Sequence, residues 1–271
     1  MATTAPEAGS TAPEDRFDIQ PALLPVVRRL EAAGFRDWPA SSSHYDGAWL
    51  IRLTASHPAK RLNSVNPLDP SDHHQMERRV ARAVGRFAAY GRPAMFRISP
   101  LASPLIDAYL DKAGWTRLGE SCVMHLNLAK LDLSGALVHI PMKDLNRFMS
   151  AALVVREFDR SLRPGLTEII SSIKAETGLF VIEDKGAPVG TAIVAHEGDL
   201  AGLFEVGSRS TARRQGHARA AIMAALKWAK SRGARRAWLQ VENDNAPAIG
   251  LYESVGFRRV YNYHYRQEPQ A

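Results

Sequence analysis

The sequence predicts an α/β (α+β) protein made of two lobes, each a sheet flanked by helices. The chain has 271 residues, close to two domains at roughly 150 residues each. Its 45% hydrophobic and 23% charged residues are typical of a globular chain with buried cores. Segments with helical spacing of apolar residues alternate with strand-like segments, and a weak internal repeat relates the two parts of the chain.

The first part of the chain is expected to mix helices and strands after a flexible tail. Residues 1–16 are rich in Ala, Thr, Pro, Gly and Ser and show no apolar periodicity, which predicts the tail. Apolar spacing predicts a helix from Leu23 to Gly34 and a longer one that begins at Asp72 and runs to Phe87. The other expected elements are strands at 49–54, 95–98 and 115–128 and a helix at 103–113.

The second part is expected to begin after a linker at 129–135. Two short helical patterns follow, and then three apolar segments separated by the turns Asp184-Lys185-Gly186 and Glu197-Gly198-Asp199. This pattern predicts a three-stranded antiparallel meander over 179–206. The remaining expected elements are a helix over 218–233, a strand at 237–241, a helix over 245–256 and a tyrosine-rich strand at 257–266.

Charge and cysteine content narrow the classes of function. The 35 Lys and Arg residues against 28 Asp and Glu give a net charge of +7, which favours anionic partners without identifying them. Cys122 is the only cysteine, so an intramolecular disulfide is impossible and a reducing, cytoplasmic setting is expected. No apolar segment is long enough to cross a bilayer, and no secretion signal is recognised at the start of the sequence. Adjacent His73 and His74 cannot share a helical face, and no metal site is predicted.

The most informative segment is Arg213-Arg214-Gln215-Gly216-His217-Ala218-Arg219, between a predicted strand and a predicted helix. Unpaired N–H groups and the positive end of the helix dipole bind phosphate at a helix start, and glycine allows close approach. By itself this R-x-x-G-x-A pattern is more typical of a solvated basic helix start. It gains weight from Asn245-x-x-Ala248-x-x-Leu251-Tyr252-x-x-x-Gly256-Phe257, which follows after one more strand.

Together these segments resemble the GNAT superfamily of N-acetyltransferases over residues 137–266. In that family the R/Q-x-x-G-x-G/A loop holds the pyrophosphate of acetyl-CoA, and the downstream segment borders the thioester. The resemblance implies transfer of an acetyl group from acetyl-CoA to a primary amine, without a metal. It also implies that each lobe is a mixed, mostly antiparallel twisted sheet. Two positions depart from the pattern: Ala218 replaces the commoner glycine, and Ser210 stands where proline is frequent.

Carried over position by position, the resemblance assigns cofactor binding to three places. The loop residues that would bind phosphate are Arg213, Arg214, Gln215, Gly216, His217 and Ala218, with Arg219 as a neighbour. The backbone at Glu205 and Val206 would run beside the pantetheine arm. Asn245 would cap the helix that carries Tyr252, reach the cofactor, or do both.

Two side chains are candidates for proton transfer. A departing CoA thiolate needs a proton donor, and the phenol of Tyr252, with an ordinary pKa of about 10, stays protonated at neutral pH. Core packing is the other interpretation of Tyr252. A protonated amine cannot attack a thioester, so a base must remove its proton. Glu205 is the first candidate, Glu242 the alternative, and a water chain or a purely structural glutamate remain open.

The last predicted strand carries Tyr261, Tyr263 and Tyr265 at alternating positions. This spacing places the three tyrosines on one face of the strand. They either pack in the core or line a pocket for the acceptor.

The first part of the chain is predicted to be a degenerate copy of the second. Ile106–Thr116 echoes Ile249–Arg258, and aligning Gly114 with Gly256 places Leu110 opposite Tyr252. The region corresponding to the phosphate loop reads Lys60-Arg61-Leu62-Asn63-Ser64-Val65-Asn66-Pro67 and lacks a glycine loop. The chain therefore resembles tandem GNAT proteins, with a degenerate domain at 17–130 that braces a catalytic domain at 131–271 and helps to form the acceptor site.

Two other functions remain open. A GNAT-fold transferase could use another acyl donor, which the width of the pocket would decide. A nucleic-acid-binding module would explain the net charge and the pairs Arg213-Arg214 and Arg235-Arg236. A basic face with interleaved aromatic residues would favour that module, but these arginines concentrate around one loop. The acceptor amine and the oligomeric state are not specified by the sequence.

Overall fold

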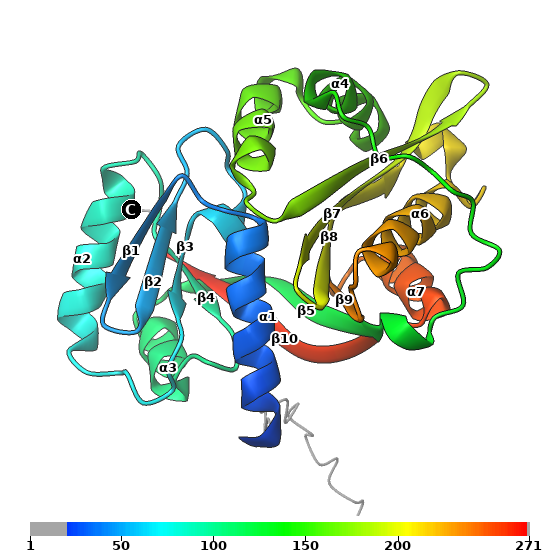
Figure 1. The fold of residues 1–271 in the computed structure, drawn as a ribbon. Helices are drawn as coiled ribbons and strands as arrows, with labels where there is room; N and C mark the ends of the chain where they lie inside the picture. Colours follow the sequence, from blue (N-terminus) through cyan, green and yellow to red (C-terminus); the bar gives the residue numbers. More distant parts are fainter. Residues whose placement is uncertain (1–20, 270–271) are drawn as a thin grey trace, which may run out of the picture.

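In the computed structural model, which describes residues 21–269, ten strands form one continuous mixed sheet with helices on both faces (Figure 1). The tail expected at residues 1–16 lies outside the described residues. Along the sheet the order is β1-β2-β3-β4-β10-β5-β9-β8-β7-β6. Within the described part only the pairs β3–β4 and β8–β9 are parallel. The predicted fold class is confirmed.

The elements follow the chain in two similar series. The first series is α1 (Leu24–Asp37), β1 (Ser42–Asp46), β2 (Trp49–Leu53), β3 (Ser64–Pro67), α2 (Met76–Ala88), β4 (Met95–Ile98), α3 (Pro104–Lys112) and β5 (Thr116–Asn127). The second is α4 (Leu145–Arg156), α5 (Arg163–Ser172), β6 (Glu176–Asp184), β7 (Ala187–Glu197), β8 (Leu200–Ser208), α6 (His217–Ser231), β9 (Arg236–Glu242), α7 (Ala246–Val255) and β10 (Arg258–Gln267). The predicted meander is present as β6, β7 and β8.

The final strands of the two series are exchanged at the centre of the sheet. β10 pairs with β4 of the first series, and β5 pairs with β9 of the second. β5 and β10 also pair with each other, so Cys122 of β5 lies between Val241 and Asn262. The sheet order therefore reads alike from both ends, and neither series completes its part of the sheet alone.

The helix ends confirm the alignment of the two series. In α3 the N–H of Trp115 donates to the carbonyl of Leu110 at 3.0 Å, and after α7 the N–H of Phe257 donates to Tyr252 at 3.0 Å. Gly114 and Gly256 both adopt positive φ, 78° and 112°, as this helix ending requires. Leu110 and Tyr252 thus occupy equivalent places, and only Tyr252 carries a hydroxyl.

Alternate residues of the central strands face two different cores. Met124 of β5 packs with α6 and α7, whereas its neighbour Val123 packs with α1, α4 and α5 on the opposite face. A third core joins α2 and α3 to the strands of the first series. Period-two burial on a sheet covered by helices on both sides explains these continuous apolar strands.

Two predictions in the first series were wrong, and two strands were missed. The helix expected from Asp72 begins at Met76, and β1 and β3 were not predicted. β1 has the polar sequence SSHYD at an edge, and β3 is four residues long and ends in proline, so neither shows an apolar period. Because α2 follows β3 as α6 follows β8, the counterpart of the phosphate loop is 68–75 rather than 60–67.

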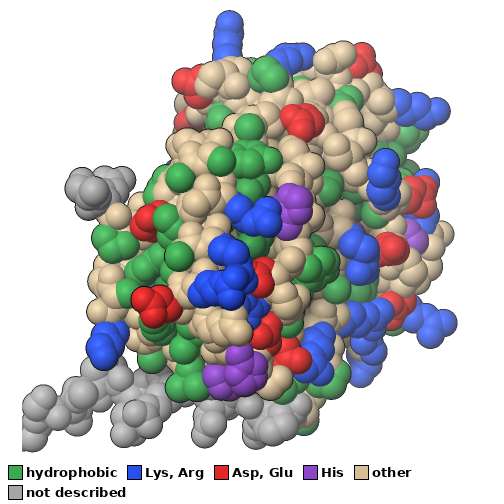
Figure 2. Space-filling view, turned by 90° about the vertical axis from the view of Figure 1, so that its left-hand side faces the viewer, with side chains coloured by type: hydrophobic (Ala, Val, Ile, Leu, Met, Phe, Trp, Pro, Cys, Tyr) green, Lys and Arg blue, Asp and Glu red, His purple; other side chains and the backbone are tan. Residues whose placement is uncertain are grey.

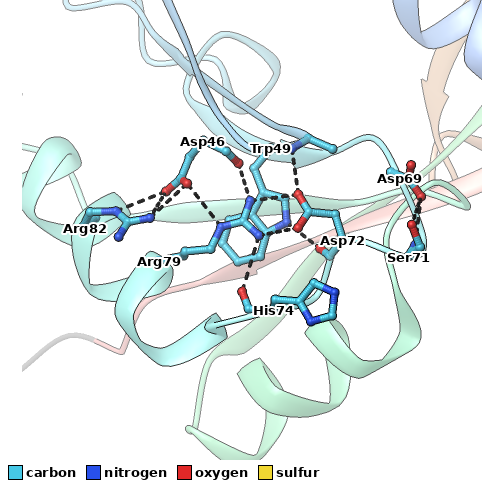
Figure 3. Close-up of polar contacts among 9 residues, drawn as sticks. Asp46, Trp49, Asp69, Ser71, Asp72, His74, Arg79 and Arg82 are labelled. Atoms are coloured by element: carbon cyan, nitrogen blue, oxygen red, sulfur yellow. Dashed lines mark hydrogen bonds and ion pairs between the residues drawn. The ribbon is translucent and has the colours of Figure 1, made fainter.

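The carboxylates of that counterpart loop are bonded to neighbouring groups of the protein (Figure 3). Asp72 accepts a hydrogen bond from the backbone N–H of Ala48 at 2.7 Å and pairs with Arg79, also at 2.7 Å. Arg79 also contacts Asp46, which pairs with Arg82 at 2.7 Å. The hydrogen bond from Arg79 holds the pKa of Asp72 below its usual range. The carboxylate of Asp72 in this loop therefore binds Arg79 of α2, and residues 68–75 contain no glycine.

The face of the molecule on the α2 side carries Lys and Arg side chains with Asp and Glu side chains beside them (Figure 2). The pairs of Arg79 with Asp72 and of Arg82 with Asp46 belong to this part of the fold. Among the basic residues of this part of the fold, Arg79 and Arg82 are paired with carboxylates.

Candidate active site

The two parallel strands of the second series separate after the third residue of each strand. β8 and β9 pair from Leu200–Arg236 to Gly202–Trp238, and they do not pair beyond that point. β8 also bulges against β7 between Phe204 and Gly207, with Glu205 at a positive φ of 47°. A non-glycine residue in this conformation costs about 1 kcal/mol or more and is typical of functional sites. The hydroxyl of Thr191 donates to the carbonyl of Glu205 at 3.1 Å and supports the bulge.

A cavity of about 420 Å³ lies at this separation. Four of the predicted site residues line it together: Glu205, Val206, Asn245 and Tyr252. The cavity is also lined by the alternative base Glu242 and by residues of the first series, His57, Lys60, Arg61 and Ser121. Both series therefore contribute to one site.

The predicted phosphate loop lies outside this cavity, at the start of α6. Arg214 and Gly216 adopt positive φ, 61° and 84°, and turn the loop into the helix. No backbone N–H from Arg214 to Arg219 donates a hydrogen bond to a residue in the described part of the chain. A Cβ at Gly216 would meet no atom within 4 Å, so the loop is open to solvent. Consecutive free N–H groups at a helix start form an anion-binding concavity.

Tyr252 projects from α7 to the cavity and is 7% exposed. Burial raises the pKa of its phenol to about 12, opposed by Arg156 and assisted by Glu205. Its ring packs edge-on against Phe257 at 6.0 Å between centroids. The side chain is thus both a core residue and a protonated hydroxyl at the wall of the cavity.

Glu205 lies between two arginines that the sequence analysis missed. Its Oε1 accepts a hydrogen bond from Arg61 Nη2 at 2.8 Å, and its Oε2 lies 3.7 Å from Arg156 Nε. The side chain is 11% exposed, and Oε2 is buried without a hydrogen-bond partner in the described part of the chain. Arg61 is held over the ring of Trp38 at 4.5 Å, and Trp38 stacks on Phe204 at 5.0 Å.

Glu242 is the more exposed of the two candidate carboxylates. Its side chain is 58% exposed and lies 3.4 Å from Lys60 Nζ. It therefore sits at the rim of the cavity, where solvent screens its charge.

Asn245 caps the helix that carries Tyr252. Its Oδ1 accepts the N–H of Ala248 at 3.2 Å, at the first turn of α7. The capping role is confirmed, and the cofactor role of Asn245 stays a prediction.

The three tyrosines of β10 share one face, as predicted, and pack in the core; whether they line a pocket for the acceptor stays a prediction. Tyr261 donates to Glu31 Oε1 at 2.6 Å, and Tyr263 donates to Gln240 Oε1 at 2.9 Å. All three are at most 5% exposed and pack in the same core. Tyr263 and Tyr265 in addition line the cavity.

Residues 21–269 contain neither a cluster of metal ligands nor a helix that could span a membrane. No group of three or more His, Cys, Asp or Glu side chains is placed to hold a metal ion there. Every helix in this part of the chain is too short or too polar to span a bilayer.

Comparison with known proteins gives consistent results. The model of the family described as "Probable histone acetyltransferase Rv0428c C-terminal" matches residues 26–266. The uncharacterized N-acetyltransferase YobR of Bacillus subtilis is 24% identical over 254 residues, covering 89% of this chain and 98% of that protein. A GCN5-related N-acetyltransferase from Kribbella flavida has a similar fold, with a TM-score of 0.67 at 18% identity over 91% of this chain and 96% of that one. A tandem GNAT protein from the clavulanic acid biosynthesis pathway matches with a TM-score of 0.58 at 14% identity over 89% of each chain.

The family model covers nearly the whole described chain, and the solved structures share its fold in both series. The chain belongs to the Rv0428c C-terminal acetyltransferase family and is a GNAT-superfamily N-acetyltransferase.

Proposed function

We propose that this N-acetyltransferase moves an acetyl group from acetyl-CoA to a primary amine by direct attack on the thioester. The observation that carries the proposal is the separation of β8 from β9 at the bulge of Glu205, with Tyr252 lining the cavity there and the open loop 213–219 joining β8 to α6. We place the enzyme in the cytoplasm because its only cysteine, Cys122, is free and buried.

The residues present suit a CoA thioester. The free N–H groups from Arg214 to Arg219 would bind the pyrophosphate, and Arg213, Arg214 and Arg219 add positive charge. β8 beyond Gly202 is not paired to β9, so the backbone near Val206 would accept the amide groups of the pantetheine arm as a neighbouring strand would.

The chemistry balances without a covalent enzyme intermediate. The amine nitrogen forms a bond to the thioester carbonyl carbon, and the carbon–sulfur bond breaks. The CoA thiolate takes the phenolic proton of Tyr252, whose raised pKa keeps it protonated until that moment. Glu205 takes the extra proton of the ammonium form of the acceptor before attack, and a water is the carrier because the carboxylate is nearly buried and already bonded to Arg61. Glu205 then loses that proton to solvent, and the second proton, released from the amine nitrogen as the amide forms, returns through solvent to the Tyr252 phenolate, so both groups are restored.

The test is a screen of primary amines with acetyl-CoA, with free CoA and the mass of the acetylated amine as readouts. We expect release of CoA to require the amine and the product to gain one acetyl group. The same screen with propionyl-CoA and butyryl-CoA decides the acyl donor. CoA release that is independent of every amine, or faster transfer from the longer donors, would overturn the proposal as stated.

Tight RNA binding with no affinity for CoA would instead favour the nucleic-acid alternative. Pairing of Arg79 with Asp72 and of Arg82 with Asp46 argues against it, because these cations already hold carboxylates.

A further inference from the structure

The first series supplies one wall of the cavity through a loop that is rigidly held. His57, Lys60 and Arg61 all line the cavity from this loop. Asn63, 5% exposed, donates to the carbonyls of His57 at 2.8 Å and Ala59 at 3.1 Å. It also accepts the N–H of Thr54 at 2.8 Å. A buried amide with three such bonds fixes the loop in one conformation before any substrate arrives.

His57 offers a hydrogen-bond donor rather than a base. Its Nδ1 accepts the backbone N–H of Ala59 at 3.1 Å, so the proton of the neutral ring is on Nε2. Burial lowers the pKa of His57, with Glu205 opposing this and Arg61 and Arg92 adding to it. The ring therefore stays neutral, and Nε2–H is available as a donor.

Lys60 is the cation of this wall that has no close acceptor among the described residues. It is 34% exposed, its ion-pair partner is the exposed Glu242 at 3.4 Å, and it lies over the ring of Tyr265 at 5.6 Å. Arg61, by contrast, bonds Glu205 at 2.8 Å, and Arg156 donates to the carbonyl of Val206 at 3.0 Å. The amide oxygen of Gln240 is already taken by Tyr263. A partly buried cation that lacks a close acceptor favours binding of an anion.

We propose that the acceptor carries a carboxylate beside its amine, and that Lys60 and the Nε2–H of His57 bind this carboxylate. The proposal rests on the proposed function and names its substrate class, a free amino acid or a small derivative that retains the acid. The amine then lies toward Glu205 and Tyr252, which line the same cavity. Lys60 exchanges its long, solvent-screened contact with Glu242 for a shorter one with the substrate.

The kinetic test compares acceptors that differ only at the acid. L-amino acids are assayed with acetyl-CoA beside their carboxamides and their decarboxylated amines. For the best acceptor we expect kcat/KM to be about 10-fold or more above that of its amide, because charged hydrogen bonds to the acid are lost in the amide. Equal kcat/KM for acid and amide overturns the proposal.

Lys60→Met is expected to lower kcat/KM for the acid by about 10- to 100-fold, chiefly through KM, and to change that for the amide by less than about threefold. Lys60→Glu is expected to reverse the order of acid and amide. Lys112→Met is the matched control, since Lys112 is exposed in the last turn of α3 and does not line the cavity. An acid preference that survives both Lys60 changes overturns the proposal.

A binding measurement separates this inference from the proposed function. Calorimetric titration of the CoA-loaded protein with 3-phenylpropanoate or 4-methylpentanoate, each beside its amide, reports the anion site without acetyl transfer. We expect tighter binding of the acids and loss of that difference in Lys60→Met. If this pattern holds while no amine is acetylated, the anion site stands and the proposed reaction fails. If acids and amides bind alike, the anion site itself is wrong.

Discussion

At the scale of single residues, Tyr252 is both a buried core residue and the candidate proton donor of the site. It is buried enough to belong to the core, yet its place at the cavity wall suits proton donation. Tyr252→Phe keeps the packing and removes the proton, so we expect kcat to fall by about 10²- to 10⁴-fold with little change in CoA affinity. Because the phenol has a pKa of about 12, the wild-type rate is expected to show no decline from its ionisation up to about pH 10. An unchanged kcat, with chemistry shown to be rate-limiting, would remove Tyr252 from the mechanism.

The second prediction at this scale concerns Glu205. If its carboxylate receives the amine proton, Glu205→Gln should lower the rate most at neutral pH and less at high pH, where the amine is already neutral. The measurement is the ratio of wild-type to variant kcat/KM between about pH 6.5 and 10. The alternative is that Glu205 is only structural, because its carboxylate also pairs with Arg61 and Arg156 at the bulge of β8. A ratio that does not vary with pH would assign Glu205 to that structural role.

At the scale of elements, the loop that starts α6 has an internal control at the other end of the same helix. Gly216 and Gly233 both adopt positive φ, 84° and 99°, and a Cβ added at either position would meet no atom within 4 Å. Gly216→Trp and Gly233→Trp therefore carry a similar backbone penalty of about 1 kcal/mol or more, but only the first obstructs a phosphate. We expect calorimetry to show weaker CoA binding for Gly216→Trp alone. Equal affinities in the two folded variants would show that the loop does not hold the cofactor.

The end of α1 carries a buried carboxylate that destabilises the fold as it ionises. Asp37 is 2% exposed, its Oδ1 is unpartnered among the described residues, and it lies beneath Gly202. Burial raises its pKa to about 7, with Arg36 opposing and Glu197 assisting. The folded state thus holds this proton more tightly than the unfolded chain, so stability falls as pH rises from about 4 to 7 and levels off above.

Asp37→Asn is expected to remove that slope. At 1.36 kcal/mol per pKa unit, the variant should gain up to about 4 kcal/mol relative to the wild type between pH 4 and 8. Urea unfolding at several pH values measures the difference. Asp184→Asn in the exposed β6–β7 turn is the control, and the same pH slope in wild type and Asp37→Asn would refute the assignment.

At the scale of the whole molecule, the exchange of β5 and β10 makes the two series interdependent. A cut near Leu133 leaves 131–271 without β5, whose Met124 and Leu126 fill its core and whose backbone pairs with β9 and β10. We expect fragment 131–271 alone to aggregate or to acetylate poorly, because apolar surface, one edge of β9 and both edges of β10 are exposed. Co-expression with 1–130 should restore solubility and CoA release. A soluble, fully active fragment would show that the exchanged strand is dispensable, and the boundary at 130/131 stays a prediction until then.

The degenerate loop of the first series predicts one CoA site per chain. The counterpart loop 68–75 has Gln75 in place of Gly216 and binds its own Arg79 through Asp72. Calorimetry on the intact protein should give a stoichiometry of one, and two sites of similar affinity would show that the first series is not degenerate.

The sequence by itself determined the elements whose signals are local. Glycines within the turns predicted the meander, and the glycines that end two helices, Gly114 and Gly256, revealed the repeat. The order of the segments around 213–219 and Tyr252 indicated the superfamily. Each of these depends on residues within one or two turns of each other, where backbone sterics, capping and free N–H groups act directly.

Only the tertiary structure decided which distant side chains meet. The exchange of β5 and β10 brings the two series into one sheet. The loop at 57–61 then comes to lie across from β8, and Arg61 bonds Glu205, which is 144 residues away in the sequence. Arg61, Arg156 and Lys60 gave no local signal, because an arginine or lysine on a loop or helix end is ordinarily solvated. Strand pairing and ion pairing across such separations depend on the packing of the whole sheet, and no periodicity in the sequence records that packing.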